Sequence, residues 1–174
     1  MQNQFDITAY HLNRAPLSDL SNQSGMFLAG ECPCTRPKNA SAELNFLKSF
    51  GVKNIFSLIT EIDKQQLRVK NLFSNFGEFG FSVTHFPITD RSIPDFDSHE
   101  RLRLMLLKMQ SCLTTNTVFY LHCQAGLGRT GLVTALFLRQ VGVSPNNAIE
   151  FVRLRRPGSI ETTEQENFVH NFRI

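Results

Sequence analysis

Cys123 begins a run of residues whose types and spacing suit the binding of an anion. The run lies in "HCQAGLGRTG", residues 122–131, and places Gly126, Gly128 and Arg129 within six positions of the thiol. Glycines allow backbone torsions that turn successive N–H groups toward one point. The planar guanidinium of arginine can hold two oxygens of one phosphate group. We therefore predict an anion site. Its expected phosphate-binding residues are Gln124, Ala125, Gly126, Leu127, Gly128 and Arg129.

The thiol of Cys123 is predicted to be a nucleophile. Converging amides, an arginine and the start of a helix lower the pKa of a thiol and favour the thiolate. A thiolate beneath a bound phosphorus atom can attack it. The loop differs from the P-loop of nucleotide-binding proteins, because it has no lysine. A buried core cysteine is the other interpretation, which the neighbouring glycines and arginine disfavour.

Strands and helices are predicted to alternate around this run. Residues 116–123 are short, β-branched or aromatic, and apolar on both faces, which is typical of a central strand. A helical pattern runs from Thr130 to a stop at Gly142, so Cys123 lies between a strand and a helix. Further strands are expected at 26–30, 52–59 and 81–88, and further helices at 40–51, from 63, after Ser98, after Ser144 and from about 162. This order predicts an α/β fold with a mostly parallel central sheet flanked by helices.

Length and composition indicate one globular domain over residues 1–174. The 41% hydrophobic content is enough for one core, and the net charge of +3 is too small for a nucleic-acid surface. The first twenty residues lack the pattern of a signal peptide, and no apolar stretch approaches membrane-spanning length. We therefore expect a soluble protein of a reducing compartment, the cytoplasm or the nucleus.

The four cysteines do not have the spacing of a disulfide framework. The "CPC" sequence at Cys32 and Cys34 supplies only half of a zinc signature, since no second Cys/His pair stands nearby. We interpret both as ordinary reduced cysteines and expect neither a metal nor a cofactor.

A family resemblance rests on several of these stretches. "HCQAGLGRTG" matches H-C-x-x-G-x-x-R-[ST]-G, the signature of cysteine-dependent protein tyrosine and dual-specificity phosphatases. "LRRPGSIETTEQ", residues 154–165, resembles the carboxyl-terminal segment of the small atypical dual-specificity phosphatases, and "FLAG", "FGVKNIFSLITE" and "HFPITD" follow the order that family uses. The resemblance implies the dual-specificity phosphatase fold and a metal-independent reaction through a cysteinyl phosphate. Phosphorylated proteins would be the substrates of a monomeric enzyme.

Such a reaction needs a carboxyl group that protonates the leaving oxygen. Asp63, Asp90, Asp95 and Asp97 are the candidates near the predicted strand ends. "HFPITD" resembles the acid loop of the family, with Asp90 at the place of the acid. Asp95 or Asp97 is expected to begin the following helix. We select Asp90.

Three further residues have predicted supporting roles. Thr130 can donate a hydrogen bond to the sulfur of Cys123, or it can simply cap the helix. His122 is, by resemblance, a buried residue that orders the loop. Gln165 corresponds to a glutamine that positions the hydrolytic water in related phosphatases, although Thr162 and Gln165 also fit a capping box. We interpret a cluster of arginines as a solvated helix face, with contact between one member and a second acidic group of the substrate as the alternative: Arg153, Arg155 and Arg156.

Other functions stay open. A phosphoinositide phosphatase is disfavoured because Gln124, Ala125 and Leu127 carry no charge, and an RNA 5′-phosphatase because the chain offers no polyanion track. A catalytically silent phosphate-binding scaffold would keep the same motif. The leading hypothesis is a protein phosphatase that hydrolyses phosphotyrosine and also phosphoserine or phosphothreonine.

Overall fold

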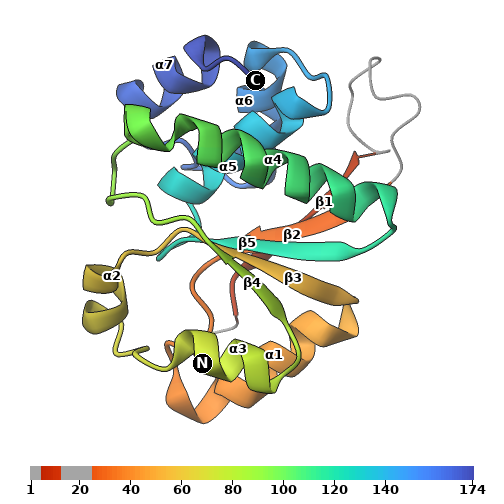
Figure 1. Cartoon of the computed structure of the whole chain (residues 1–174), viewed down its shortest axis with the longest axis vertical. Helices are drawn as coiled ribbons and strands as arrows, with labels where there is room; N and C mark the ends of the chain where they lie inside the picture. The colour runs from red at the N-terminus through yellow and green to blue at the C-terminus, as the bar shows by residue number, and fades with distance from the viewer. Residues whose placement is uncertain (1–4, 13–24) are drawn as a thin grey trace.

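A five-stranded sheet runs through the middle of the computed structural model, which describes residues 5–12 and 25–174 (Figure 1). Its strands, in spatial order, are β1 (Ile7–His11), β2 (Met26–Gly30), β5 (Val118–His122), β3 (Val52–Ser57) and β4 (Ser82–His85). β1 is antiparallel to β2, and all other neighbours are parallel. β5 is the central strand, as its two apolar faces predict. The mostly parallel α/β sheet is confirmed.

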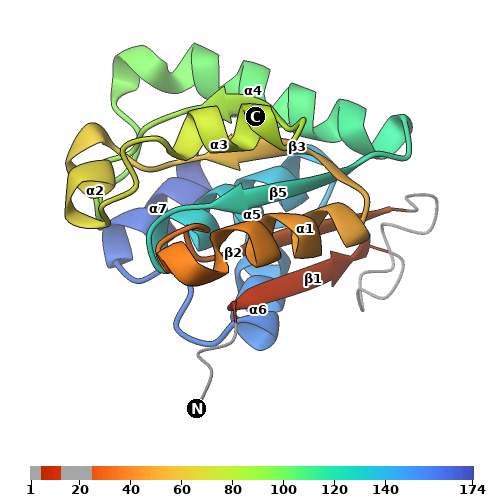
Figure 2. The same ribbon diagram turned by 90° about the horizontal axis from the view of Figure 1, so that it is seen from below.

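Helices cover both faces of this sheet (Figures 1 and 2). One face carries α4 (His99–Thr114), α5 (Gly128–Gln140), α6 (Pro145–Arg155) and α7 (Thr163–Asn171). The other carries α1 (Ala40–Ser49) and α3 (Leu72–Glu78), and short 3-10 helices span Pro37–Asn39 and Phe96–Ser98. The short α2 (Glu61–Gln66) lies where the carboxyl ends of β3, β4 and β5 meet (Figure 1). Among the described residues, no helix combines the length and apolar character needed to cross a membrane.

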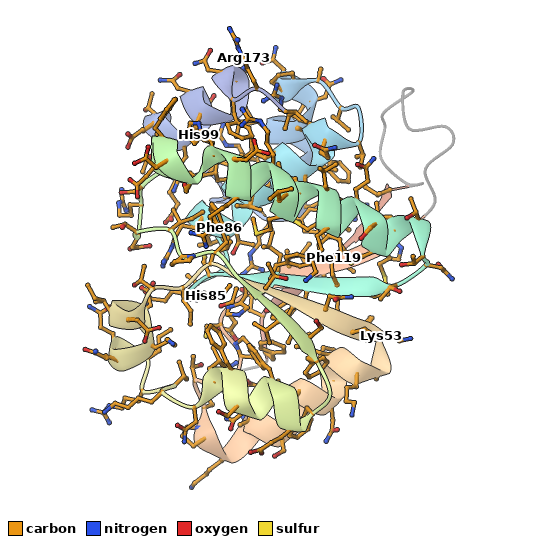
Figure 3. The ribbon with its side chains drawn as sticks, viewed as in Figure 1. Lys53, His85, Phe86, His99, Phe119 and Arg173 are labelled. Atoms are coloured by element: carbon orange, nitrogen blue, oxygen red, sulfur yellow. The ribbon has the colours of Figure 1, made fainter. Side chains whose placement is uncertain are left out.

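Two apolar cores fill the layers between the sheet and its helices (Figure 3). Under α4 to α7, the ring of Phe27 stacks on those of Tyr10 and Phe119, each with a centroid distance of 4.9 Å. Under α1 and α3, Ile55 and Tyr120 are fully buried. Burying each such large side chain stabilises the fold by about 1.5 to 3 kcal/mol. The two cores fix the sheet, and with it the loops at the strand ends.

The element boundaries follow the sequence prediction with local differences. Ser144 accepts a hydrogen bond from the N–H of Asn147 and Pro145 takes the first helical position of α6, as predicted. Asn39 occupies the N-cap position of α1 but makes no side-chain capping bond there. The helix after the cysteine loop starts at Gly128, two residues before the predicted Thr130. The loop is therefore shorter, and its last glycine already belongs to the helix.

Candidate active site

Cys123 is the first residue after β5, at the predicted junction of strand and helix, and it is buried. The backbone N–H of Gly126 donates to its sulfur at 3.3 Å. Gly126 has a φ of +75°, and a Cβ at this position would collide with the backbone of Gly30, so only glycine fits. The N–H of Cys32 holds the carbonyl of Gln124 at 2.8 Å. The loop thus curls around the sulfur and is fastened to the end of β2.

Arg129, in the first turn of α5, is only 1% exposed. Its Nη1 lies 2.6 Å from a carboxylate oxygen of Asp63 and 3.0 Å from the carbonyl of Ile88. Its Nη2 lies 2.9 Å from the carboxylate of Asp90. Burial lowers the pKa of Arg129, but the hydrogen bond to Asp63 and nearby negative groups raise it more, so the guanidinium stays charged. Its Nε is buried and has no hydrogen-bond partner.

The two carboxylates that hold Arg129 have different surroundings. Asp63 is buried, its carboxylate accepts the Thr60 N–H in the capping box of α2, and the same carboxylate accepts from the guanidinium. Burial raises the pKa of Asp63, and the bonds from Arg129 and Thr60 outweigh this, so its pKa is lowered. The side chain of Asp90 is 57% exposed and faces the loop from the chain segment after β4. An ionised Asp63 is a poor proton donor, which leaves Asp90 as the candidate donor of this pair.

The other two candidate acids lie farther along the same segment. Asp95 occupies the N-cap position of the 3-10 helix at Phe96–Ser98, and its carbonyl accepts from Ser98. Asp97 is exposed within that helix. In the described chain, neither carboxylate forms a hydrogen bond or ion pair with Arg129. Asp95 thus begins the short 3-10 helix that leads into α4, and Ser98 rather than either aspartate occupies the N-cap position of α4 itself.

His122 and Thr130 flank the nucleophile loop. The ring of His122 is fully buried, and its Nδ1 lies 3.0 Å from the carbonyl of Cys123. Burial lowers the pKa of His122 to about 4, so the ring is neutral at neutral pH. The hydroxyl of Thr130 is buried without a hydrogen-bond partner, so the predicted bond to the sulfur of Cys123 is absent from this structure. The sulfur instead receives the N–H of Gly126.

Gln165 is completely buried beside the loop. Thr162 accepts the N–H of Gln165, as a capping box requires, but the side chain of Gln165 accepts the N–H of Glu161 instead of that of Thr162. The amide of Gln165 also donates to the carbonyl of Ser92, in the segment that carries Asp90. Gln165 therefore joins α7 to the predicted acid loop.

One member of the arginine cluster contradicts the sequence interpretation. Arg155 is exposed over the ring of Phe151, and Arg153 is partly exposed and paired with Glu166. Arg156, in contrast, is only 6% exposed and donates to the carbonyls of Ala125 and Gly126 in the loop. The helical pattern ends at Arg155, so Arg156 leaves the solvated face and turns inward.

The sequence did not reveal how three residues contact the loop or its arginine. Glu161 lies against the loop, and a Cβ added at Gly128 would collide with its carboxylate. Asp63 was considered only as an acid, although the spacing of Thr60 and Asp63 carries a capping-box signal that would have fixed its place at a helix start. No comparable sequence signal marks Glu161 or Arg156.

Cys32 and Cys34 are buried free thiols. Burial raises the pKa of both, that of Cys34 to about 12. Within residues 5–12 and 25–174, no group of three His, Cys, Asp or Glu side chains could hold a metal ion.

Comparisons with known proteins identify the family. A family model described as cyclin-dependent kinase inhibitor 3 matches residues 4–149. The chain belongs to this family. Its relatives include cyclin-dependent kinase inhibitor 3 of Sus scrofa, 34% identical over 139 residues, a match that spans 78% of this chain but only 64% of the relative. Protein tyrosine phosphatase type IVA 3 of Bos taurus is 33% identical over 165 residues, 93% of this chain and 87% of the relative.

Solved structures agree with this assignment. A kinase-associated phosphatase whose catalytic-site cysteine is replaced by serine superimposes with a TM-score of 0.85 and 28% identity, covering 99% of this chain and 96% of that one. Tk-PTP in its active form gives 0.65 and 26% identity, covering 82% and 86%. The chain is thus a member of the cysteine-based protein tyrosine and dual-specificity phosphatase superfamily, as the sequence signature predicted.

Proposed function

We propose that this protein is a metal-independent protein phosphatase that hydrolyses phosphotyrosine, and phosphoserine or phosphothreonine, with Cys123 as nucleophile. The observation that carries the proposal is the N–H of Gly126 aimed at the sulfur of Cys123, 3.3 Å away, within a loop flanked by Arg129. A buried cation and an inward-directed amide both stabilise the negative charge of a phosphate bound at this point. The unpartnered Nε of Arg129 leaves a donor for a phosphate oxygen.

In the first step, the thiolate of Cys123 attacks phosphorus and the bond between phosphorus and the leaving oxygen breaks. Asp90 gives its proton to that oxygen, so that an alcohol or phenol departs and the carboxylate remains. The amides of residues 124–129 and the guanidinium of Arg129 stabilise the charge on the equatorial oxygens. Removing one such donor from a comparable site lowers turnover by about 10² to 10³.

In the second step, water attacks the cysteinyl phosphate. The Asp90 carboxylate accepts a proton from the water, the phosphorus–sulfur bond breaks, and its electron pair returns to the sulfur of Cys123. Thr130 would donate to the departing sulfur after its free hydroxyl turns toward it, and Gln165 would orient the water. His122 keeps the loop in place through the Cys123 carbonyl.

Phosphorylated proteins are the proposed substrates of a single catalytic domain formed by residues 1–174. The names of two relatives, a kinase-associated phosphatase and a protein tyrosine phosphatase, support this class. The loop residues Gln124, Ala125 and Leu127 add no cation for the extra phosphates of a phosphoinositide. Because an active thiolate is easily oxidised, the enzyme would work in a reducing compartment.

The test compares wild-type protein with Cys123→Ser on phosphotyrosyl and phosphothreonyl peptides and on phosphoinositide micelles. Wild type should hydrolyse the peptides with the higher kcat/KM, and Cys123→Ser should be inactive. Cys112→Ser, which alters another buried thiol on α4, is the matched control and should keep full activity. Equal activity of Cys123→Ser and wild type would refute the proposed nucleophile, and a preference for phosphoinositides would refute the substrate class.

A further inference from the structure

Arg156 lies beneath the cysteine loop, although it is 33 positions away from Cys123 in the sequence. Its Nε donates to the carbonyl of Gly126 at 2.7 Å, and its Nη2 donates to the carbonyl of Ala125 at 3.0 Å. Few side chains could make both bonds, because the two donors must be held together in one rigid plane, as they are in a guanidinium. The guanidinium of Arg156 therefore binds two consecutive peptide groups of the loop.

The direction of these carbonyls fixes the direction of the neighbouring amides. In a trans peptide, the C=O of one residue points away from the N–H of the next. When Arg156 holds the carbonyl of Ala125 outward, the N–H of Gly126 points inward, and it does donate to the sulfur of Cys123. By the same geometry, holding the carbonyl of Gly126 directs the N–H of Leu127 toward the inside of the loop.

The far side of the guanidinium contacts the segment that forms β1, the outermost strand of the sheet. Figure 2 shows this strand at the edge of the sheet. Nη1 and Nη2 of Arg156 lie 2.9 and 2.8 Å from the two carboxylate oxygens of Asp6, just before β1. Nη1 also lies 3.3 Å from the hydroxyl of Thr8. Two parallel bonds to one carboxylate fix the plane of the guanidinium. The side chain of Asp6 is 64% exposed, so its main effect is orientation.

We propose that Arg156 is a positioning residue that holds the anion-binding amides of the cysteine loop in place, with Asp6 as its anchor. The inference rests on the proposed function only in taking the loop as the phosphate site. Without Arg156, both peptide groups can rotate, and the amides of the cysteine loop must be reoriented each time an anion binds. The loss should therefore appear first in the binding of anions and only then in turnover.

Alkylation of Cys123 offers a readout that does not depend on phosphatase activity. Iodoacetate is an anion that binds to the amides of the cysteine loop before it reacts, whereas neutral iodoacetamide reports the reactivity of the sulfur alone. The ratio of the two rates, measured for the Cys123 peptide by mass spectrometry, reports the organisation of the amides. The other charged or titratable groups around this sulfur are the same in wild type and in the variants, so a change in the ratio between them is not due to these groups: Arg129, Asp63, Asp90, His122, Cys32, Tyr120 and Glu161.

Wild type should react faster with iodoacetate, and inorganic phosphate should protect it. Arg156→Ala should lower the ratio of rates and the affinity for phosphate by about tenfold, the effect of losing charge-assisted hydrogen bonds. Arg156→Lys keeps the positive charge but cannot bind both loop carbonyls at once. Asp6→Asn leaves Arg156 in place but weakens its bonds to residue 6. Each variant should lower the ratio of rates by about threefold. If Arg156→Ala does not fold, these two milder variants test the proposal in its place. Arg155→Ala, the exposed neighbour, is the matched control and should leave the ratio unchanged.

The outcomes separate this inference from the proposed function. If folded Arg156→Ala, or both milder variants in its place, keeps the wild-type ratio, Arg156 does not organise the loop. The same conclusion follows if wild type itself shows no preference for iodoacetate. If wild type shows the preference and Arg156→Ala loses it, the inference holds even where no phosphate ester is hydrolysed, and only the proposed reaction fails.

Discussion

The carboxylate of Asp63 lies 2.6 Å from Nη1 of Arg129, and both side chains are buried at the carboxyl end of the sheet. The two residues are 66 positions apart, so the contact depends on the whole fold. Asp63 is itself fixed by the capping box with Thr60 at the start of α2. Its carboxylate therefore orients the guanidinium before any substrate arrives, which avoids a reorganisation cost during the reaction.

Replacing Asp63 with asparagine should leave Arg129 charged, buried and without its main partner. Breaking a buried ion pair on one side costs about 3 to 5 kcal/mol, so the free energy of unfolding should fall by this order. We expect kcat/KM to fall at least about tenfold, because the guanidinium loses its orientation. Urea unfolding and steady-state kinetics measure the two effects. Glu61→Gln, an exposed change on the same helix, should alter neither, and a wild-type kcat/KM in Asp63→Asn would contradict the positioning role.

Asp90→Asn tests the proton donor. Its carboxylate lies 2.9 Å from Nη2 of Arg129, on the exposed side of the loop. General acid catalysis contributes about 10² to 10⁴ in rate, and it matters most for a leaving group that needs a proton. We expect kcat for a phosphothreonyl peptide to fall by about 10², with a much smaller change for p-nitrophenyl phosphate. Asp95→Asn and Asp97→Asn are the matched controls. A larger loss in either of them than in Asp90→Asn would move the acid to that position.

Local patterns in the sequence predicted the elements that these residues depend on. The apolar run before Cys123 and the glycines after it were sufficient to place a strand, a loop and a helix, because each pattern acts within about ten residues. Two features escaped prediction for a common reason. The edge strand β1 is half-buried and pairs only with β2, and Arg156 turns inward only because the loop and Asp6 lie beside it. Both arise from contacts between distant segments, which local periodicity does not encode.

The stability of the protein should depend on His122 in mildly acidic solution. Burial, against the opposing hydrogen bond with the Cys123 carbonyl and with smaller contributions from His85 and Arg129, lowers the pKa of His122 to about 4, compared with about 6.5 in an unfolded chain. Between these values the unfolded state binds more protons. The free energy of unfolding should therefore fall as the pH drops from about 6.5 toward 4, by up to about 3 kcal/mol. Asp63, whose pKa is lowered, loses its stabilising effect only at still lower pH.

His122→Asn places an amide near the position of the ring Nδ1 and removes the titrating group. Its free energy of unfolding should be lower than that of wild type at pH 7, because part of the ring volume is lost. Its dependence on pH between about 6.5 and 4 should be shallower. Urea unfolding at several pH values compares the slopes, and parallel slopes for the two proteins would refute the assignment to His122.

Glu161 is expected to weaken the binding of anions. Its carboxylate lies against Gly128, at the start of α5, where the helix dipole and the loop amides favour negative charge. Glu161→Gln should therefore lower the inhibition constant of inorganic phosphate by about threefold at low salt. Added salt should reduce this difference between the variant and wild type. Glu164→Gln, an exposed acidic position on α7, is the control and should change little. Equal effects from both variants would indicate a general charge effect and contradict a specific role of Glu161.

Gln165 can be assigned to the water step or to structure by separating the two chemical steps. Its amide joins the N–H of Glu161 to the carbonyl of Ser92, and it lies beside Gly128. If it orients water, Gln165→Leu should slow hydrolysis of the cysteinyl phosphate by about tenfold and spare its formation. Rapid-quench kinetics with p-nitrophenyl phosphate would then show a full burst of p-nitrophenol followed by a slower steady state. Thr162→Ala removes only the capping bond to the Gln165 N–H, so it should lower stability by about 1 kcal/mol without changing the burst. A Gln165→Leu variant that loses stability but keeps both kinetic phases would show that the residue only supports the helix and the acid loop.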